Sequence, residues 1–219
     1  MNLDLHVHSV FSGDSPVSPE EYARRMKELQ VDYDVSGFVL MEHNHFITPE
    51  ECNLPKIARK YDLVILSGVE VDTHWGHLLV YGMTEGLWAK IQSNGLRKQE
   101  PLALARLIEA EGAVSVPAHP FRFFIGMGER CRELSGVRAV ETLNGSNSEQ
   151  ENGFAVRLAL KMGWAATGGS DSHFPAELGK SLTRFPNPIS FMDDMIRELK
   201  AGACQALFLE EARKRKAHG

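Results

Sequence analysis

The sequence contains little cysteine, no long apolar run and no excess of positive charge. Its three cysteines, Cys52, Cys131 and Cys204, lie far apart and form no CxxC pair, so we expect semi-buried core residues rather than a disulfide framework. No window approaches the apolar length that a membrane-spanning helix needs. The first residues form neither a basic nor an apolar leader, so we expect no secretory signal and a cytoplasmic protein.

Acidic residues outnumber basic residues by 29 to 24, which gives a formal net charge of −5. This balance disfavours broad binding to an anionic membrane or to long nucleic acid, although nucleic acid stays open as a partner. A small phosphorylated substrate or a nucleotide is the more natural partner, because bound metal ions can reverse the potential inside a cleft. No sequence feature indicates an obligate protein partner.

Short apolar runs alternate with amphipathic stretches about seven times along the 219 residues. The runs cover residues 2–5, 37–41, 63–69, 77–81, 113–117, 137–143 and 164–167. This alternation predicts an α/β fold of parallel strands covered by helices, and it favours a (β/α) barrel over a doubly wound sheet without deciding between them. We expect one domain over residues 1–209 and a polar tail over residues 210–219 that frays and leaves His218 solvated.

Capping residues mark the expected helix starts. Ser18-Pro19-Glu20-Glu21 combines a hydroxyl cap, a proline at the first helical position and a reciprocating glutamate, and Thr48-Pro49-Glu50-Glu51 repeats the pattern. Further helices are expected over residues 101–111, 148–162 and 190–201, and they end at Gly112, Gly163 and Gly202.

Eight of the nine histidines, with several acids, lie at or next to the ends of the apolar runs. The first run ends in Asp4-Leu5-His6-Val7-His8, and the last in Gly169-Ser170-Asp171-Ser172-His173. In a barrel, the rim at the carboxyl ends of the strands gathers catalytic residues from different strands. The distribution therefore predicts a functional site at this rim.

Imidazole and carboxylate together suit zinc, manganese or iron. His6 and His8 are two apart on a strand and point to one side, and Asp171 and His173 repeat that spacing. The nine plausible ligands are His6, His8, Asp14, His43, Glu70, His77, His119, Asp171 and His173. Nine exceeds the three or four protein ligands that one catalytic ion takes, so we expect two or three divalent ions, with Glu70 able to bridge two of them.

Several of these residues have a plainer alternative role. Asp14 follows Ser12-Gly13 and fits a turn or cap. Asn144 fits either a substrate-binding residue or the cap of the helix near Ser148. His45 and His74 fit groups that support a ligand or face solvent, and His74 competes with His77 for the same ligand position.

The order of these motifs resembles the polymerase and histidinol phosphatase (PHP) family over residues 3 to about 180. The matching residues are His6-x-His8, Asp14, Glu42-His43-Asn44, Gly68-x-Glu70, His77, Ala118-His119-Pro120, Asn144 and Asp171-x-His173. The resemblance implies a distorted (β/α)7 TIM-like barrel in a single domain, a trinuclear metal centre and phosphoester hydrolysis. It implies one ion on His6, His8, Glu70 and Asp171, a second on Glu70, His77 and His119, and a third on Asp14, His43 and His173.

The chain departs from the family pattern in three places. Glu42 stands where the family usually has aspartate, and Asp14 stands where some members have histidine. The interval between Glu70 and His119 is too short for the small domain that nucleotidase-like members carry there, so the substrate preference of that subgroup does not transfer.

For a phosphoester hydrolase, the expected nucleophile is metal-bound hydroxide, which attacks phosphorus in line. His45 is a candidate to protonate the leaving alkoxide. Arg122 is a candidate phosphate clamp, with a surface salt bridge as the alternative, and Lys180 is a weaker candidate of the same kind. The aromatic stretch over residues 121–128 fits either packing under the rim or a lid or base-stacking wall for a nucleotide.

Two other functions compete with phosphoester hydrolysis. An amidohydrolase-type metallohydrolase also begins with HxH and ends with aspartate, but it typically uses a bridging lysine where this chain has Glu70. A non-catalytic, metal-stabilised accessory module is the third hypothesis. Monoester and diester substrates both remain open, as does the identity of the metal.

Overall fold

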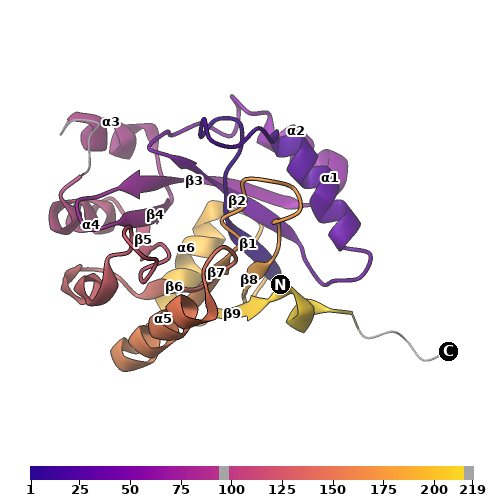
Figure 1. Ribbon diagram of the computed structural model, residues 1–219. Helices are drawn as coiled ribbons and strands as arrows, with labels where there is room; N and C mark the ends of the chain where they lie inside the picture. The colour runs from indigo at the N-terminus through magenta and orange to yellow at the C-terminus, as the bar shows by residue number, and fades with distance from the viewer. Residues whose placement is uncertain (94–98, 215–219) are drawn as a thin grey trace.

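The computed structural model describes residues 1–93 and 99–214, and its strands form two sheets (Figure 1). Within these residues, a seven-stranded sheet has the order β5-β4-β3-β2-β1-β8-β9, and β6 pairs with β7 in a second sheet. The strands are β1 (Asn2–Val7), β2 (Gly37–His43), β3 (Val64–Asp72), β4 (His77–Tyr81), β5 (Val114–Pro117), β6 (Ala139–Asn144), β7 (Ala165–Gly169), β8 (Ser181–Arg184) and β9 (Gln205–Phe208). Each of the seven predicted apolar runs thus forms a strand.

The directions of the strands bring several strand ends to one edge of the sheet. β1, β2 and β3 are parallel, β4 is antiparallel to β3, and β5 is antiparallel to β4. The carboxyl ends of β1, β2, β3 and β5 therefore share an edge with the amino end of β4. The end of β7 joins the same edge, because the N–H of Asp171 donates to the carbonyl of His6 over 2.7 Å and Val7 pairs with Ser172.

The α/β single-domain fold agrees with the prediction, and the sheet is curled into a half-barrel. Among the described residues, the pairing differs from a regular parallel barrel in three respects, the first of which is that β6 and β7 form a sheet of their own. A tight turn rather than a crossover helix joins β3 to β4, so these strands are antiparallel. Two unpredicted strands, β8 and β9, extend the sheet beyond β1 in antiparallel pairing.

Six α-helices lie among the described residues, and four of them begin within two residues of their predicted starts. The helices are α1 (Pro19–Leu29), α2 (Leu54–Tyr61), α3 (Glu85–Ser93), α4 (Pro101–Ala110), α5 (Glu149–Met162) and α6 (Met192–Ala201), with 3-10 turns at Gly128–Glu133 and Leu209–Ala212. The predicted start at Thr48 is wrong. Thr48 and Glu51 exchange the hydrogen bonds of a capping box, but Asn53 adopts φ 54°, and the helix begins only at Leu54.

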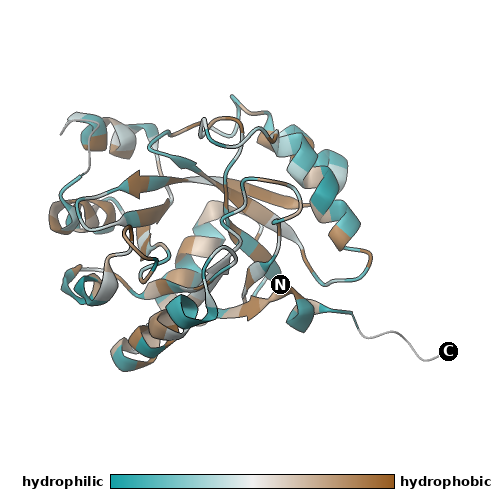
Figure 2. Cartoon of the chain, viewed as in Figure 1, coloured by the Kyte–Doolittle hydropathy of each residue, from teal (hydrophilic) through white to brown (hydrophobic). Residues whose placement is uncertain are grey.

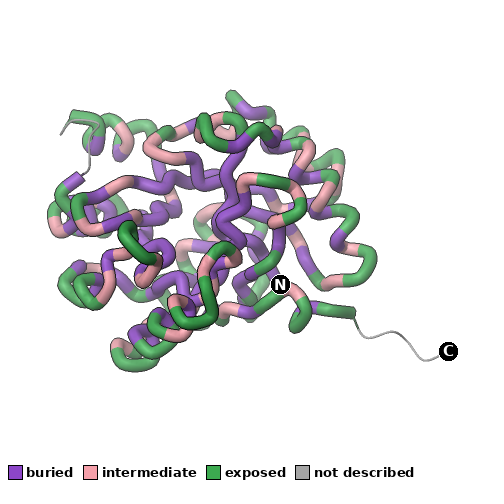
Figure 3. Tube along the Cα trace, in the orientation of Figure 1, coloured by how far each residue is buried: buried purple, intermediate pink, exposed green. Residues whose placement is uncertain are grey.

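Burial follows the strands. The buried part of the chain runs along the sheet, while the outer faces of the helices are exposed (Figure 3). The hydropathy of the residues shows the same division, with the apolar ones concentrated in the strands and on the inner helix faces (Figure 2). None of the helices among the described residues is long and apolar enough to span a membrane.

The first part of the expected C-terminal tail contacts the rest of the protein. The N–H of Asp34 donates to the carbonyl of Ala212 over 2.7 Å, and the N–H of Lys214 donates to the carbonyl of Asp32 over 2.8 Å. Residues 210–214 are thus held by backbone hydrogen bonds rather than free. The remaining tail, including His218, lies outside the described residues.

Candidate metal centre

All nine predicted ligands gather at the shared edge of the sheet. They are His6, His8, Asp14, His43, Glu70, His77, His119, Asp171 and His173. His77 reaches this edge because β4 starts there, opposite the end of β3. The competing His74 is exposed in the β3–β4 turn, so the geometry favours His77.

Glu70 lies at the centre of the cluster and is fully buried. Its Oε1 is 2.8 Å from Nδ1 of His77 and 3.1 Å from Nε2 of His119. Its Oε2 is 3.2 Å from one ring nitrogen of each of three other histidines, which are His6, His8 and His43. The two oxygens of one carboxylate thus serve two different sets of imidazoles, as a bridging ligand must.

Asp171 and His119 enter the cluster on strained backbone. Asp171 has φ 55° and His119 has φ 28°, in the left-handed region that non-glycine residues rarely adopt. In this conformation, Oδ1 of Asp171 lies 3.2 Å from Nε2 of His8. Such strain is typical of sites where the surrounding structure holds a side chain in one required position.

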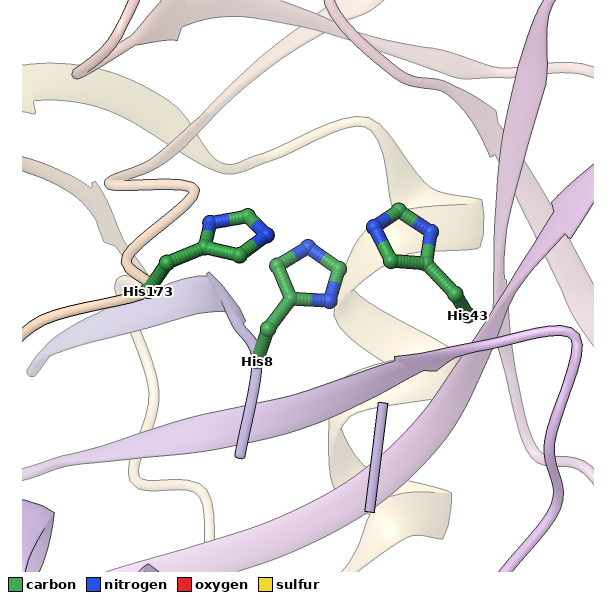
Figure 4. Close-up of side chains that lie close together, drawn as sticks. All are labelled: His8, His43 and His173. Atoms are coloured by element: carbon green, nitrogen blue, oxygen red, sulfur yellow. The ribbon is translucent and has the colours of Figure 1, made fainter. Parts of the chain in front are cut away.

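The third set of residues lies on the open side of the cluster. Oδ2 of Asp14 is 3.3 Å from Nε2 of His43 and 3.2 Å from Nε2 of His173. The rings of His43 and His173 flank the ring of His8, at centroid distances of 4.2 and 4.5 Å (Figure 4). The Asp14 side chain is 48% exposed, so this set is accessible to solvent and to a substrate.

Glu141 on β6 is a buried acid that the sequence reasoning did not single out as part of the site. Its Oε1 is 2.9 Å from Nδ1 of His6, and its Oε2 accepts the N–H of His119 over 2.7 Å. Both ring nitrogens of His6 thus face carboxylate oxygens, Nδ1 that of Glu141 and Nε2 that of Glu70. With a metal ion on Nε2, the remaining ring proton would sit on Nδ1 and be donated to Glu141. The signal in the sequence was an acid at the end of an apolar run.

Glu42, the departure from the family pattern, holds the other histidine of the HxH pair indirectly. It accepts hydrogen bonds from Ser9 and, over 2.5 Å, from the hydroxyl of Ser12. The Ser12 oxygen lies 3.2 Å from Nδ1 of His8 and accepts the N–H of His43. The longer acid therefore fits as a support rather than a ligand, and Ser12 is a second residue that the sequence reasoning missed.

The electrostatics of the cluster are strongly coupled. Burial alone would raise the pKa of Glu70 and of Asp171, but the surrounding imidazoles hold both values well below the usual range. Burial would lower the pKa of His8, but hydrogen bonds to Asp171 and Glu70 raise it to about 9. Burial lowers the pKa of His43. The carboxylates thus favour positive charge at the centre, whether from protons or from metal ions.

The donor atoms fit divalent ions. Nδ1 of His119 is buried and has no hydrogen-bond partner among the described residues, and Nε2 of His8 faces carboxylate oxygens of Glu70 and Asp171, each at 3.2 Å. Three groups of residues each bring their donor atoms within 4.8 Å of one another. The groups are His6, His8 and Asp171; His6, Glu70 and His119; and His8, His43 and His173. These groups overlap with the three ligand sets that the family resemblance implies, without being identical to them. A polynuclear site is therefore compatible with the geometry.

Arg122, one of the proposed substrate-binding residues, lies at the cluster rather than on the surface. Its Nη1 is 2.7 Å from Oδ2 of Asp171, so the two oxygens of Asp171 face the imidazoles and the guanidinium respectively. Its Nη2 and Nε donate to Asn144 and Asn147 over 2.6 and 2.7 Å. Asn144 also donates to Glu141, so it organises the site as well as ending β6.

Two other candidates lie farther out. His45 is exposed, and the described contacts connect it with Glu51 rather than with the cluster. The Lys180 side chain is exposed beside Gly145, in the loop that follows Asn144. The geometry thus brings neither residue into the group around Glu70, and their catalytic and binding roles stay predictions.

Comparisons with known proteins agree with this fold. A family model described as PHP-associated matches residues 149–204, from α5 to just beyond α6. No curated protein matches the chain. The chain is similar to part of a two-domain protein from Bacteroides vulgatus that contains a predicted PHP-like metal-dependent phosphoesterase, with TM-score 0.65 and 19% identity over 96% of this chain and 65% of that chain.

Two further solved structures share the fold. An amidohydrolase from Chromobacterium violaceum with bound sulfate has TM-score 0.65 and 18% identity over 100% of this chain and 99% of that one. The lesion-specific endonuclease Q from Pyrococcus furiosus has TM-score 0.62 and 14% identity, over 94% of this chain and 57% of that chain. The class is therefore an α/β protein with a curled sheet and a site of clustered metal-ligating side chains. The family-model match over residues 149–204 agrees with the resemblance to the PHP family that the ordered motifs carry, and the solved structures share the fold.

Proposed function

We propose that the protein is a metal-dependent hydrolase of phosphoester bonds that uses two or three divalent ions. The observation that carries this proposal is the position of Glu70, whose two oxygens face five imidazoles from four strands. Held by these residues, divalent ions would activate water as the nucleophile at neutral pH and would offset the charge that develops on phosphoryl oxygens. Zinc, manganese and iron all suit these donors.

The chain's own residues would orient the phosphate. The three guanidinium nitrogens of Arg122 face Asp171, Asn144 and Asn147, which leaves the second N–H of Nη1 and of Nη2 to face a phosphoryl oxygen. Glu141 keeps His6 and the backbone of His119 in place, so the buried half of the site is preorganised. The exposed Asp14 edge is the side from which a substrate enters.

The similar structures support the proposal without deciding the substrate. The Bacteroides protein contains a predicted PHP-like metal-dependent phosphoesterase, and endonuclease Q is a lesion-specific endonuclease that takes a duplex substrate with an abasic lesion. The Chromobacterium amidohydrolase carries a sulfate, a tetrahedral anion shaped like phosphate, but its name favours the second candidate function, amide hydrolysis. Against that candidate, a glutamate rather than a lysine occupies the centre of this site.

The deciding experiment is hydrolysis of a panel of phosphomonoesters, phosphodiesters and amides by the manganese-loaded protein. His6→Ala and Asp171→Asn are assayed alongside, with the exposed His74→Ala as the matched control. We expect metal-dependent turnover of a phosphoester that both site variants lose and the control keeps. Turnover of amides alone would support the amidohydrolase hypothesis. Tight metal binding without turnover of any substrate would support the hypothesis of a non-catalytic accessory module.

A further inference from the structure

Two phenyl rings lie exposed on the loop that follows β5, next to the metal centre. Phe123 is 75% exposed and Phe124 is 92% exposed, and their ring centroids are 4.0 Å apart. The first aromatic of the same stretch, Phe121, instead packs against Phe154 at 5.6 Å. The stretch thus divides into one residue that anchors the loop and two that it presents to solvent.

The loop is built to hold the two rings in one place. The N–H of Gly128 donates to the carbonyl of Pro120 over 2.6 Å, and the N–H of Gly126 donates to the carbonyl of Arg122 over 2.9 Å. A Cβ on Gly126 would lie 2.3 Å from the carbonyl oxygen of Pro120, so only glycine permits this close return of the chain. Phe124 has φ 67°, a costly conformation for a bulky residue.

The same loop is tied directly to the proposed site. Arg122 precedes Phe123 and contacts Asp171 over 2.7 Å, while the N–H of Phe123 donates to Glu151 over 2.9 Å. The loop therefore leads directly from a side chain at the cluster to the two exposed rings. Phe174, which is 53% exposed, follows the predicted ligand His173 in the sequence. Exposed aromatic surface thus accompanies the rim where the phosphate would bind.

We infer that Phe123 and Phe124 form a binding platform for a planar aromatic group on the alcohol side of the phosphoester, so that the substrate is a nucleoside phosphate. This inference rests on the proposed phosphoester hydrolysis. Every nucleobase has a π-face that stacks on an aromatic side chain, and two adjacent rings on a braced backbone provide such a face. A mononucleotide is favoured over a polynucleotide because the chain carries a net charge of −5 and Glu151 lies under the loop.

The test compares adenosine 5′-monophosphate with ribose 5-phosphate, which has the same phosphoester and no base. Both are assayed with the manganese-loaded wild type and with the Phe123→Ala/Phe124→Ala variant. We expect the wild type to prefer the nucleotide, and the ratio of the two kcat/KM values to fall about tenfold or more in the variant. Phe191→Ala, which truncates a phenylalanine 73% exposed near α6, is the matched control and leaves the ratio unchanged.

Three results would overturn the inference. Equal kcat/KM for the two substrates in the wild type would show that no base is recognised, while leaving the proposed hydrolase intact. An unchanged ratio in the double variant would place base recognition elsewhere. Preferred cleavage of a single-stranded oligonucleotide would show that the substrate is a polynucleotide rather than a mononucleotide.

A binding measurement separates this inference from the proposed function. If the wild type hydrolyses neither substrate, the proposed function is decided by the wider panel of phosphoesters, and titration calorimetry of adenosine 5′-monophosphate against ribose 5-phosphate tests the platform alone. Tighter binding of the nucleotide that the double variant loses would support the platform. Equal binding of the two compounds would refute it.

Discussion

Oε1 of Glu141 lies 2.9 Å from Nδ1 of His6, and both side chains are almost completely buried. The other oxygen of Glu141 accepts the N–H of His119, so one acid sets the position of two predicted ligands from two strands. A residue with this role tunes metal affinity without touching the metal. Glu141 thereby connects β6 of the two-stranded sheet with the ends of β1 and β5 in the seven-stranded sheet.

Glu141→Gln is expected to weaken metal binding by about 10- to 100-fold, because the amide replaces one acceptor oxygen with a donor. Competition titration with a chelating dye measures the affinity. Glu198→Gln, a change at a buried glutamate on α6 that accepts a hydrogen bond from Asn187, is the matched control and leaves the affinity unchanged. Equal affinities of wild type and Glu141→Gln would contradict the positioning role.

Gly169→Ala is expected to destabilise the protein by about 1–3 kcal/mol and to reduce its metal content. A Cβ at residue 169 would lie 2.4 Å from the Cβ of His6, so β7 and β1 must move apart at the site. Thermal denaturation and elemental analysis check the two effects. Gly86→Ala in α3, where a Cβ meets nothing closer than 4.0 Å, should be neutral or stabilising.

Asp14→Asn is expected to remove the most weakly held ion and to leave the others. Asp14 is the exposed member of its set, and the buried groups around Glu70 do not depend on it. Metal analysis after gel filtration should show about one ion fewer per chain, while Asp193→Asn, at an exposed position on α6, changes nothing. Loss of every ion in Asp14→Asn would show instead that the sets bind as one unit.

Metal uptake near pH 8 is expected to release protons. The pKa of His8 is raised to about 9, above the value near 6.5 of an unfolded histidine, so the metal-free site holds a proton there that a metal ion must displace. That proton stabilises the metal-free fold fully below pH 6.5, and its contribution is lost as the pH rises through 9. The loss is expected to appear as a lower Tm of the metal-free protein at high pH.

Calorimetric titration of the metal in buffers of different ionisation enthalpy counts the released protons. The apparent enthalpy should change with the buffer at pH 8 and change less at pH 10. A buffer-independent enthalpy at pH 8 would show that the metal-free site holds no displaceable proton. His74→Ala serves as the control, because this exposed histidine lies outside the cluster.

Many residues of the candidate site could be predicted from the sequence because the patterns that indicate them are local. Alternation along a strand puts His6 and His8 on one side, and the apolar runs show where strands end, so the candidate ligands that cluster in the fold could be named from the sequence. The capping pattern at Ser18 likewise depends only on neighbouring residues and predicted α1 correctly. The same pattern at Thr48 failed because Asn53, farther along, takes a left-handed conformation.

The relationships across the sheet were decided only by the tertiary structure. The direction of β4, the close approach of Gly169 to His6 and the contact of Arg122 with Asp171 each join segments whose separation in the chain carries no periodic signal. Glu141 looked like any acid near a strand end until the fold placed it against His6. The sequence by itself thus determined which donor atoms are available, through residue type and local alternation. The fold determined which of them meet, because the pairing of distant strands is set by packing of the whole core.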